Sequence, residues 1–282
     1  MRHVGWLGLV FAVAWCLSPA PAVAEVSGSL TVGGDTVKPT SAVAMWSEST
    51  AFFNKGAKIL QIYMSPTAIN TEGLDQALDP DEALRDGFPA DFVVLTLDDK
   101  GAFSMIYAYI DDGAKNYGFN EGAVTLEKMG PDAVVGRVDS QGEKSLGDTP
   151  ISFDLRFSAA ILPPPPKGTD LGKDGGAPGA AYLAYVEALR QGDYATLLKH
   201  ASKAYAEELE GTPEEYRQYT LDPAKESAPQ EMTVTGGTLY GGYAFLTVAG
   251  TDWTGDKVEG KVKMVLDGDT WRFAEDDLEM VW

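Results

Sequence analysis

The segment that follows residue 162 most limits how this chain can fold. Four consecutive prolines occupy residues 163–166, and a glycine-rich stretch then runs to Gly179. Proline cannot donate to a sheet ladder and favours an extended polyproline helix, whereas glycine keeps a chain flexible. A docking peptide for an aromatic groove is the alternative. Because strand and helix patterns flank this segment directly, we predict domains at residues 25–162 and 179–282, joined by a linker over residues 163–178.

Residues 1–24 have the pattern of a signal peptide. A positive start at Arg2 precedes an apolar run too short to span a bilayer comfortably, and a small-x-small sequence ends at Ala24. An uncleaved anchor and a lipid anchor at Cys16 are the alternatives, and the bulky Trp15 disfavours the second. We therefore predict a secreted, soluble protein of the periplasm or the cell exterior, with no membrane span after cleavage.

Cleavage would also remove most of the reactive side chains. Cys16 is the only cysteine, and His3 is one of two histidines, so the mature chain would keep His200 alone. This excludes disulfides, thiolate nucleophiles and metal sites built from cysteine or several histidines. We predict no catalytic constellation, no metal and no cofactor. An exported chain without disulfides fits a bacterial envelope better than a eukaryotic secretory route.

The net charge makes this an acidic protein and restricts its partners. The chain carries 42 acidic and 22 basic residues, for a formal charge of −20, and the acids are spread through both halves. Such a field repels nucleic acid and anionic lipid. Pairs such as Asp98–Asp99 and Asp111–Asp112 lack the ligand spacing of an EF-hand and occur where turns are expected, so calcium is only the alternative to turn formation.

Residues 25–162 alternate as short strands separated by turns. Phe103, Met105, Tyr107 and Tyr109 fall on one face of such a strand. The pattern predicts an all-β antiparallel sandwich, with a barrel as the alternative. One short helix is expected near residues 81–85, capped by Asp79 or a neighbouring residue. The predicted strands are 29–32, 42–47, 58–64, 92–97, 103–110, 133–138 and 153–161.

Residues 179–282 place helices before strands. Helical periodicity covers residues 180–191, Gly192 ends that helix, and Asp193 caps a second helix that continues through Tyr205. Thr212 and Pro213 open a third, short helix. Strands are predicted at residues 232–240, 243–250, 257–266 and 270–275.

This order resembles the NTF2-like, or cystatin-like, superfamily. The segments that carry the resemblance are "ALRQGDYATLLKH" and "VKMVLDGDTWRFAEDDLEM", and they cover only the C-terminal third of the chain. The resemblance implies a C-terminal α+β cone, in which a curved sheet wraps a long helix around a cavity. It implies a pocket and leaves the reaction open.

Strand alternation nominates the residues that would line this cone. Tyr243 shares a face with Phe245, and Trp271 and Phe273 share a face with Glu275. With Tyr185 of the first helix, these are the predicted ligand-binding residues. His200 lies off the apolar face of its helix.

These patterns favour a non-catalytic binding or interaction protein of the bacterial cell envelope, whose partner is a small apolar ligand or an envelope protein. The alternative is an acid–base enzyme (an isomerase, dehydratase or hydrolase) that uses Glu275 with Tyr185 or Tyr243. A third possibility is an assembly factor that acts through the β domain.

Overall fold

A computed structural model describes residues 25–49, 54–88, 91–111, 113–226 and 228–281. The predicted signal peptide, with His3 and Cys16, lies outside the described residues. The backbone contacts divide the chain into two compact units. Unit 1 comprises Met1–Ile69 and Phe88–Pro163, and unit 2 comprises Asn70–Gly87 and Pro164–Trp282. The predicted linker and domain boundaries stay predictions.

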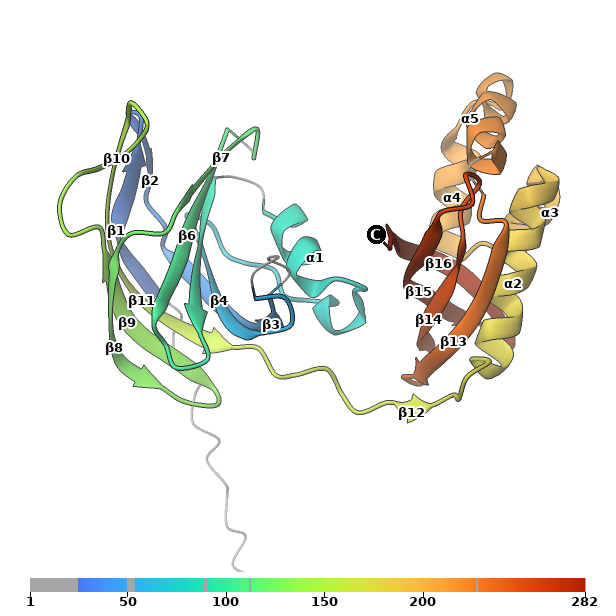
Figure 1. Ribbon diagram of the computed structural model, residues 1–282, viewed down its shortest axis with the longest axis horizontal. Helices are drawn as coiled ribbons and strands as arrows, with labels where there is room; N and C mark the ends of the chain where they lie inside the picture. The colour runs from blue at the N-terminus through green and yellow to red at the C-terminus, as the bar shows by residue number, and fades with distance from the viewer. Residues whose placement is uncertain (1–24, 50–53, 89–90, 112, 227, 282) are drawn as a thin grey trace, which may run out of the picture. The chain divides into compact units, whose positions relative to one another are not determined.

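Unit 1 is built on one hydrogen-bonded sheet, which has eleven strands in the described residues. The central path runs β2-β1-β11-β3-β4-β5-β6-β7, and β8, β9 and β10 branch from it (Figure 1). Its strands are β1 (Glu25–Val32), β2 (Asp35–Val37), β3 (Ser41–Glu48), β4 (Lys58–Ser65), β5 (Phe92–Asp98), β6 (Phe103–Ile110), β7 (Lys115–Phe119), β8 (Ala123–Met129), β9 (Ala133–Asp139), β10 (Lys144–Leu146) and β11 (Thr149–Ile161).

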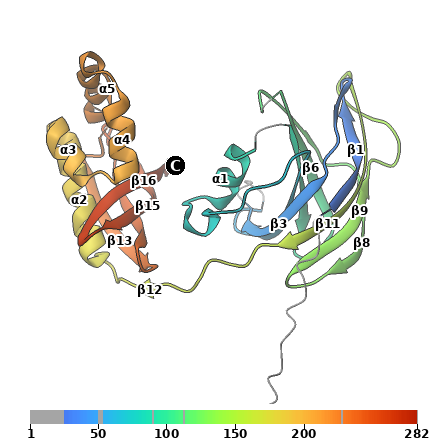
Figure 2. The same ribbon diagram turned by 180° about the vertical axis from the view of Figure 1, so that it is seen from behind.

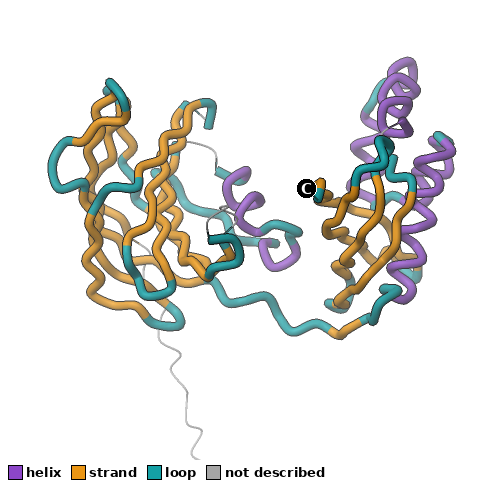
Figure 3. The backbone as a smooth tube through the Cα atoms, in the orientation of Figure 1, coloured by secondary structure: helices purple, strands orange, loops and turns teal. Residues whose placement is uncertain are grey.

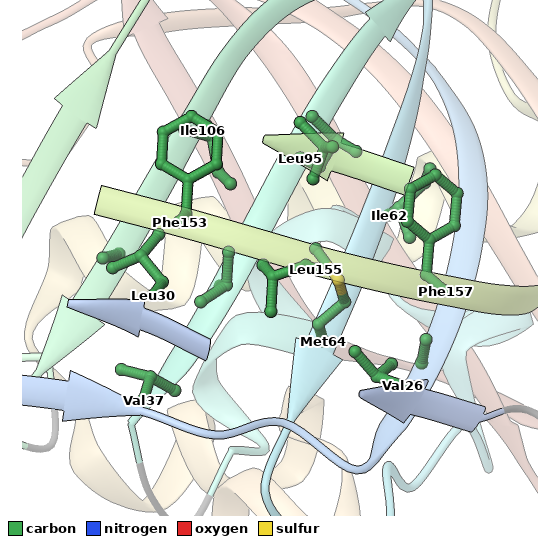
Figure 4. Packing of buried hydrophobic residues seen from close by; sticks show 14 of the residues in the cluster. Val26, Leu30, Val37, Ile62, Met64, Leu95, Ile106, Phe153, Leu155 and Phe157 are labelled. Carbon is green, nitrogen blue, oxygen red and sulfur yellow. The ribbon is translucent and has the colours of Figure 1, made fainter. Parts of the chain in front are cut away.

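Strand β11 organises this sheet. It pairs antiparallel with β1, β9 and β10, and its last two residues pair parallel with Val43 and Ala44 of β3. Its thirteen residues alternate between buried and exposed positions, as expected for a strand with one apolar face. Figure 4 shows Phe153, Leu155 and Phe157 of β11 among core side chains of other strands, including Ile62 and Ile106. Burial of this face is the main driving force for unit 1.

Unit 2 contains a second sheet and all the helices of the described residues. The order of its strands is β12-β13-β14-β15-β16, and helices α2 to α5 gather on one side of them (Figures 2 and 3). The elements of unit 2 are η1 (Leu74–Gln76), α1 (Pro80–Asp86), β12 (Thr169–Asp170), α2 (Gly176–Gln191), α3 (Tyr194–His200), α4 (Lys203–Gly211), α5 (Glu214–Glu226), β13 (Glu231–Leu239), β14 (Tyr243–Thr251), β15 (Lys257–Asp267) and β16 (Thr270–Met280).

Local capping explains where the helices start and stop. Gly192 ends α2 in the left-handed conformation, with φ 65°, and the side chain of Asp193 accepts hydrogen bonds from the first turn of α3. The second predicted helix is in fact two. Ala201 is extended, and Ser202 caps α4 by accepting from the Tyr205 N–H. Asp79 caps α1 as predicted.

The predicted fold class is wrong. The structure is mostly β, with 49% of residues in strands and 21% in helices. The strands form two sheets, and the C-terminal end of the chain belongs to the second sheet and does not form an α+β cone. Each of the seven strands predicted for residues 25–162 lies inside an observed strand. They do not form a sandwich of separate sheets, because β11 has partners on both sides and joins all of these strands into one sheet.

The expected cone also fails for a packing reason. The space between α2 and the sheet is filled by large side chains, among them Tyr182, Tyr185, Met264 and Phe273, which form one buried cluster. No cone-shaped cavity therefore runs along α2 in the described residues. In addition, part of the predicted linker is ordered in the sheet, since Thr169 and Asp170 pair with Leu239 and Thr238.

Gly28 gives a direct test of the β1–β11 pairing. Its φ is +104°, and a Cβ there would lie 1.9 Å from the Asp154 carbonyl oxygen. We expect Gly28→Ala to reduce hydrogen-exchange protection of the β1 and β11 amides by about 2 kcal/mol more than backbone strain alone would.

The matched control is Gly34→Ala. Gly34 has a similar φ of +99°, but a Cβ there would meet no atom within 4 Å. This variant should show only the strain cost, about 1–2 kcal/mol. Equal losses in the two variants would contradict the close approach of β1 to β11.

Candidate functional site

Four aromatic rings lie together on the inner face of the unit 2 sheet, the face covered by the helices. We call Tyr182, Tyr185, Tyr205 and Phe273 the aromatic cluster. The Tyr185 and Phe273 rings stack with centroids 3.9 Å apart and an interplanar angle of 5°. The Tyr205 ring meets Phe273 edge-on at 5.4 Å, and Tyr182 lies 6.4 Å from Phe273. Such offset and edge contacts stabilise the joint between α2, α4 and β16.

A β-bulge in β16 decides which carboxylate reaches this face. Phe273 pairs with Met264 and Glu275 with Lys263, so Ala274 is the extra residue. Beyond the bulge, Asp276 pairs with Val262, which is a member of the inner core. A bulge of one residue reverses the faces of all residues that follow it. Asp276 therefore takes the inner position that simple alternation assigns to Glu275.

The bulge has a visible cause in the backbone hydrogen bonds. The Phe273 carbonyl accepts a hydrogen bond of 2.6 Å from the Ser202 N–H, at the break between α3 and α4. Ala201 and Phe273 also form an isolated parallel bridge. The strand thus contacts the helical layer through its main chain at this point.

Asp276 is the most perturbed carboxylate of the described residues. Burial raises its pKa to about 6, and the neighbouring charge of Asp277 adds to the rise. The surrounding protein desolvates the carboxylate, yet the residue keeps an exposed surface. Because solvent reaches this group, the energetic effect of the shift is smaller than burial alone implies.

Two tyrosines lie within electrostatic reach of Asp276. Burial raises the pKa of both Tyr182 and Tyr185, and the charge of Asp276 raises each further. Tyr185 also interacts with the Tyr205 hydroxyl, which raises its pKa as well. The buried Tyr182 hydroxyl has no hydrogen-bond partner among the described residues. Both phenols therefore stay protonated at neutral pH, and each keeps a hydroxyl proton that it can donate.

A pocket lies beside the cluster and is formed by helices alone. It encloses about 410 Å³ of empty space, part of it open to solvent. We call it the helical pocket. Its lining residues are Leu189, Tyr194, Leu197, Tyr205, Leu209, Thr212, Arg217, Leu221 and Ala224. Tyr205 belongs to both the aromatic cluster and the pocket, so the two features are contiguous.

Polar side chains interrupt the apolar walls of the helical pocket at Tyr194, Tyr205, Thr212 and Arg217, and two of them stand out. The Tyr194 hydroxyl is buried and has no hydrogen-bond partner among the described residues. Arg217 of α5 lies over the Tyr194 ring, with its Cζ 5.3 Å from the ring centroid. Its Nε donates to the Thr212 carbonyl at 3.1 Å and its Nη2 to the Glu210 carbonyl at 3.4 Å. Both groups are hydrogen-bond donors.

The structure brings together only some of the predicted ligand-binding residues. Tyr185 and Phe273 stack, and Trp271 packs against the same core. Tyr243 and Phe245 lie on the opposite face of β14 from Leu246 and Val248, which belong to that core. Their rings contact each other and Tyr240, and the Tyr243 hydroxyl donates to the Asp75 carbonyl at 3.0 Å.

Glu275 and His200 have ordinary surroundings. Glu275 is exposed and pairs with Lys263 at 3.2 Å. Partial burial and the nearby charges of Arg272 and Lys199 lower the pKa of His200, so it is neutral at pH 7.

Sequence reasoning missed Asp276, Tyr194 and Arg217. Tyr194 and Arg217 come together only through the packing of α3 against α5. The three consecutive acidic residues Glu275, Asp276 and Asp277 interrupt the alternation of β16, which indicates an irregularity there. No residue type in the sequence marks the position of the bulge itself.

Asp276→Asn should change the pH dependence of stability. The folded-state pKa of Asp276 is raised, so its stabilising contribution is complete below the ordinary Asp value and is lost as pH rises through about 6. We expect the variant to gain about 1 kcal/mol at pH 8, after allowance for solvent screening, and nothing at pH 3. Urea unfolding at the two pH values measures this gain. Asp277→Asn is the matched control, and a pH-independent effect of Asp276→Asn would contradict the assignment.

Within the described parts of the chain, none of the helices combines the length and apolar character needed to cross a membrane. Those same parts contain no group of three or more His, Cys, Asp or Glu side chains placed to hold a metal ion. No family model matches this sequence, and no curated protein matches it. The proposals below therefore rest on the site's own geometry.

Proposed function

We propose that this protein is a non-catalytic binding protein of the bacterial cell envelope, and that unit 2 binds a small apolar ligand in the helical pocket. The observation that carries this proposal is the pocket itself. Four leucines and an alanine line a space bounded by α2, α3, α4 and α5. Ligand sites in proteins are typically concave and mostly apolar, with a few polar groups that fix orientation.

The size and environment of the pocket support a small ligand. Its cavity volume, without the space that is open to solvent, is about 70 Å³, below the roughly 300–1,000 Å³ of drug-sized ligand sites, so the pocket fits a small or slender apolar group. Removal of an apolar ligand from water into such walls is favourable at about 25 cal/mol per Å² of buried surface. Export remains part of the proposal and rests on the signal-peptide pattern of residues 1–24.

Filling the pocket should abolish binding. We expect Leu209→Trp to weaken the binding of Nile red, a neutral apolar dye, about tenfold, because the indole would occupy the space that the dye needs. Dye fluorescence measures the affinity of the full chain.

Leu183→Trp is the control, since Leu183 is exposed on α2 and does not line the pocket. Circular dichroism checks that both variants are folded. Equal dye binding by the wild type and both variants would refute this location of the ligand.

Acid–base catalysis is a second candidate function, favoured by Asp276 and not by Glu275. Asp276 has a pKa of about 6 and is reachable by solvent, and Tyr182 provides a buried hydroxyl without a partner. A base that titrates near the working pH can accept a proton efficiently. A phenol beside it can donate a hydrogen bond to the oxygen on which negative charge develops. The exposed Glu275, paired with Lys263, supports no such role.

Proton exchange tests this second function without a known substrate. In heavy water, we expect the protein to accelerate deuterium incorporation next to the carbonyl of cyclohexanone, as measured by proton NMR. Asp276→Asn should remove the acceleration, whereas Glu275→Gln and Asp277→Asn should retain it. An unaccelerated rate in the wild type, or retention in Asp276→Asn, would exclude Asp276 as the base.

A further inference from the structure

We propose that the ligand of the helical pocket is a carboxylate with an unbranched alkyl chain, and that Arg217 and Tyr194 bind its carboxylate group. This inference rests on the proposed binding function and specifies its ligand class. Three independent features of the described residues lead to it: a guanidinium without a carboxylate partner, a buried hydroxyl without an acceptor, and mostly alkyl walls.

Arg217 is an uncompensated positive charge in a strongly acidic protein. Among the described residues, no carboxylate lies within ion-pair distance of it, although Arg85, Arg137 and Arg272 each lie against an aspartate. Arg217 is partly buried, which makes an unpaired charge costly. Its contacts are two backbone carbonyls and the Tyr194 ring, and its Nη1 has no partner in the described part of the chain. An anionic ligand would supply the missing charge.

Tyr194 narrows the chemistry of the ligand further. A buried hydroxyl without a partner costs about 1–3 kcal/mol, and a bound acceptor would recover that cost. The free donors of Arg217 and the hydroxyl of Tyr194 both require acceptor oxygens. A carboxylate has two such oxygens and carries one negative charge, which matches the single guanidinium.

The walls of the pocket define the rest of the molecule. The side chains of Leu189, Leu197, Leu209, Leu221 and Ala224 offer no hydrogen bonds to a ligand. An alkyl chain fits such walls, whereas a sugar, a nucleotide or a peptide would leave polar groups unsatisfied. The ligand is therefore amphipathic, with an anionic head at Arg217 and an apolar chain among the leucines.

A purely structural role for Arg217 makes a different prediction. Its hydrogen bonds to the Glu210 and Thr212 carbonyls cap the C-terminal end of α4, a known use of arginine. If capping were its only role, loss of the charge would affect stability and would leave the preference between charged and neutral ligands unchanged.

The experiment compares octanoate with octanol, which share a chain length and differ in the head group. Calorimetric titration of the full chain at neutral pH should show octanoate bound about tenfold more tightly than octanol. Arg217→Gln should remove this preference by weakening octanoate binding far more than octanol binding. Tyr194→Phe should weaken octanoate binding about threefold or more. Arg156→Gln, an exposed arginine on β11, is the matched control and should change neither ligand.

Each result decides a separate point. Equal binding of octanoate and octanol by the wild type would overturn the carboxylate assignment and leave the proposed binding function intact. Binding of neither ligand would overturn both. A preference for octanoate that survives in Arg217→Gln would remove Arg217 from the site. If Arg217→Gln does not fold, Arg217→Lys keeps the charge while it loses the planar guanidinium, and a weaker octanoate preference in this variant supports the assignment.

Discussion

A main-chain hydrogen bond links the helical layer of unit 2 to its sheet. The Ser202 N–H donates to the Phe273 carbonyl at 2.6 Å, where the chain passes between α3 and α4. The carbonyl lies next to the bulge at Ala274, and the residues beyond it exchange faces. Asp276 thus lies on the inner face beside Tyr182 and Tyr185, and Glu275 faces the solvent. The chemistry of the inner face depends on this one backbone contact.

The same contact separates the two helices that shape the pocket. Because Ala201 is extended, α3 and α4 are distinct helices, and Tyr194 and Tyr205 approach the pocket from different directions. One continuous helix would have placed these two rings on a common apolar face. The break therefore creates both a space between the helices and a polar position on its wall. The break at Ala201 thus accompanies two features: close packing under α2, and the helical pocket that α3, α4 and α5 line together with Leu189 of α2.

Sequence reasoning located the elements better than their arrangement. Period-two alternation identified strands such as β6 and β11, and the caps at Asp79 and Asp193 marked real helix starts, because these signals are local. The single ladder of unit 1 escaped prediction, since no local pattern shows that β11 pairs with four strands. The site was only partly predicted: Tyr185 and Phe273 meet, whereas Tyr243 and Phe245 face the other way. Glu275 was assigned to the inner face because alternation was carried across a bulge that no residue type marks.

The pairing of β11 also determines the order in which the strands of unit 1 can assemble during synthesis. Residues 25–32 pair with residues 151–158, so the first strand of unit 1 must wait for the last before it can be enclosed. Contacts of such long sequence separation slow folding, because a large loop has to close first. During synthesis, unit 1 without β11 exposes unpaired strand edges and apolar side chains that β11 would later bury. Until its final strand is synthesised, such a chain is vulnerable to aggregation.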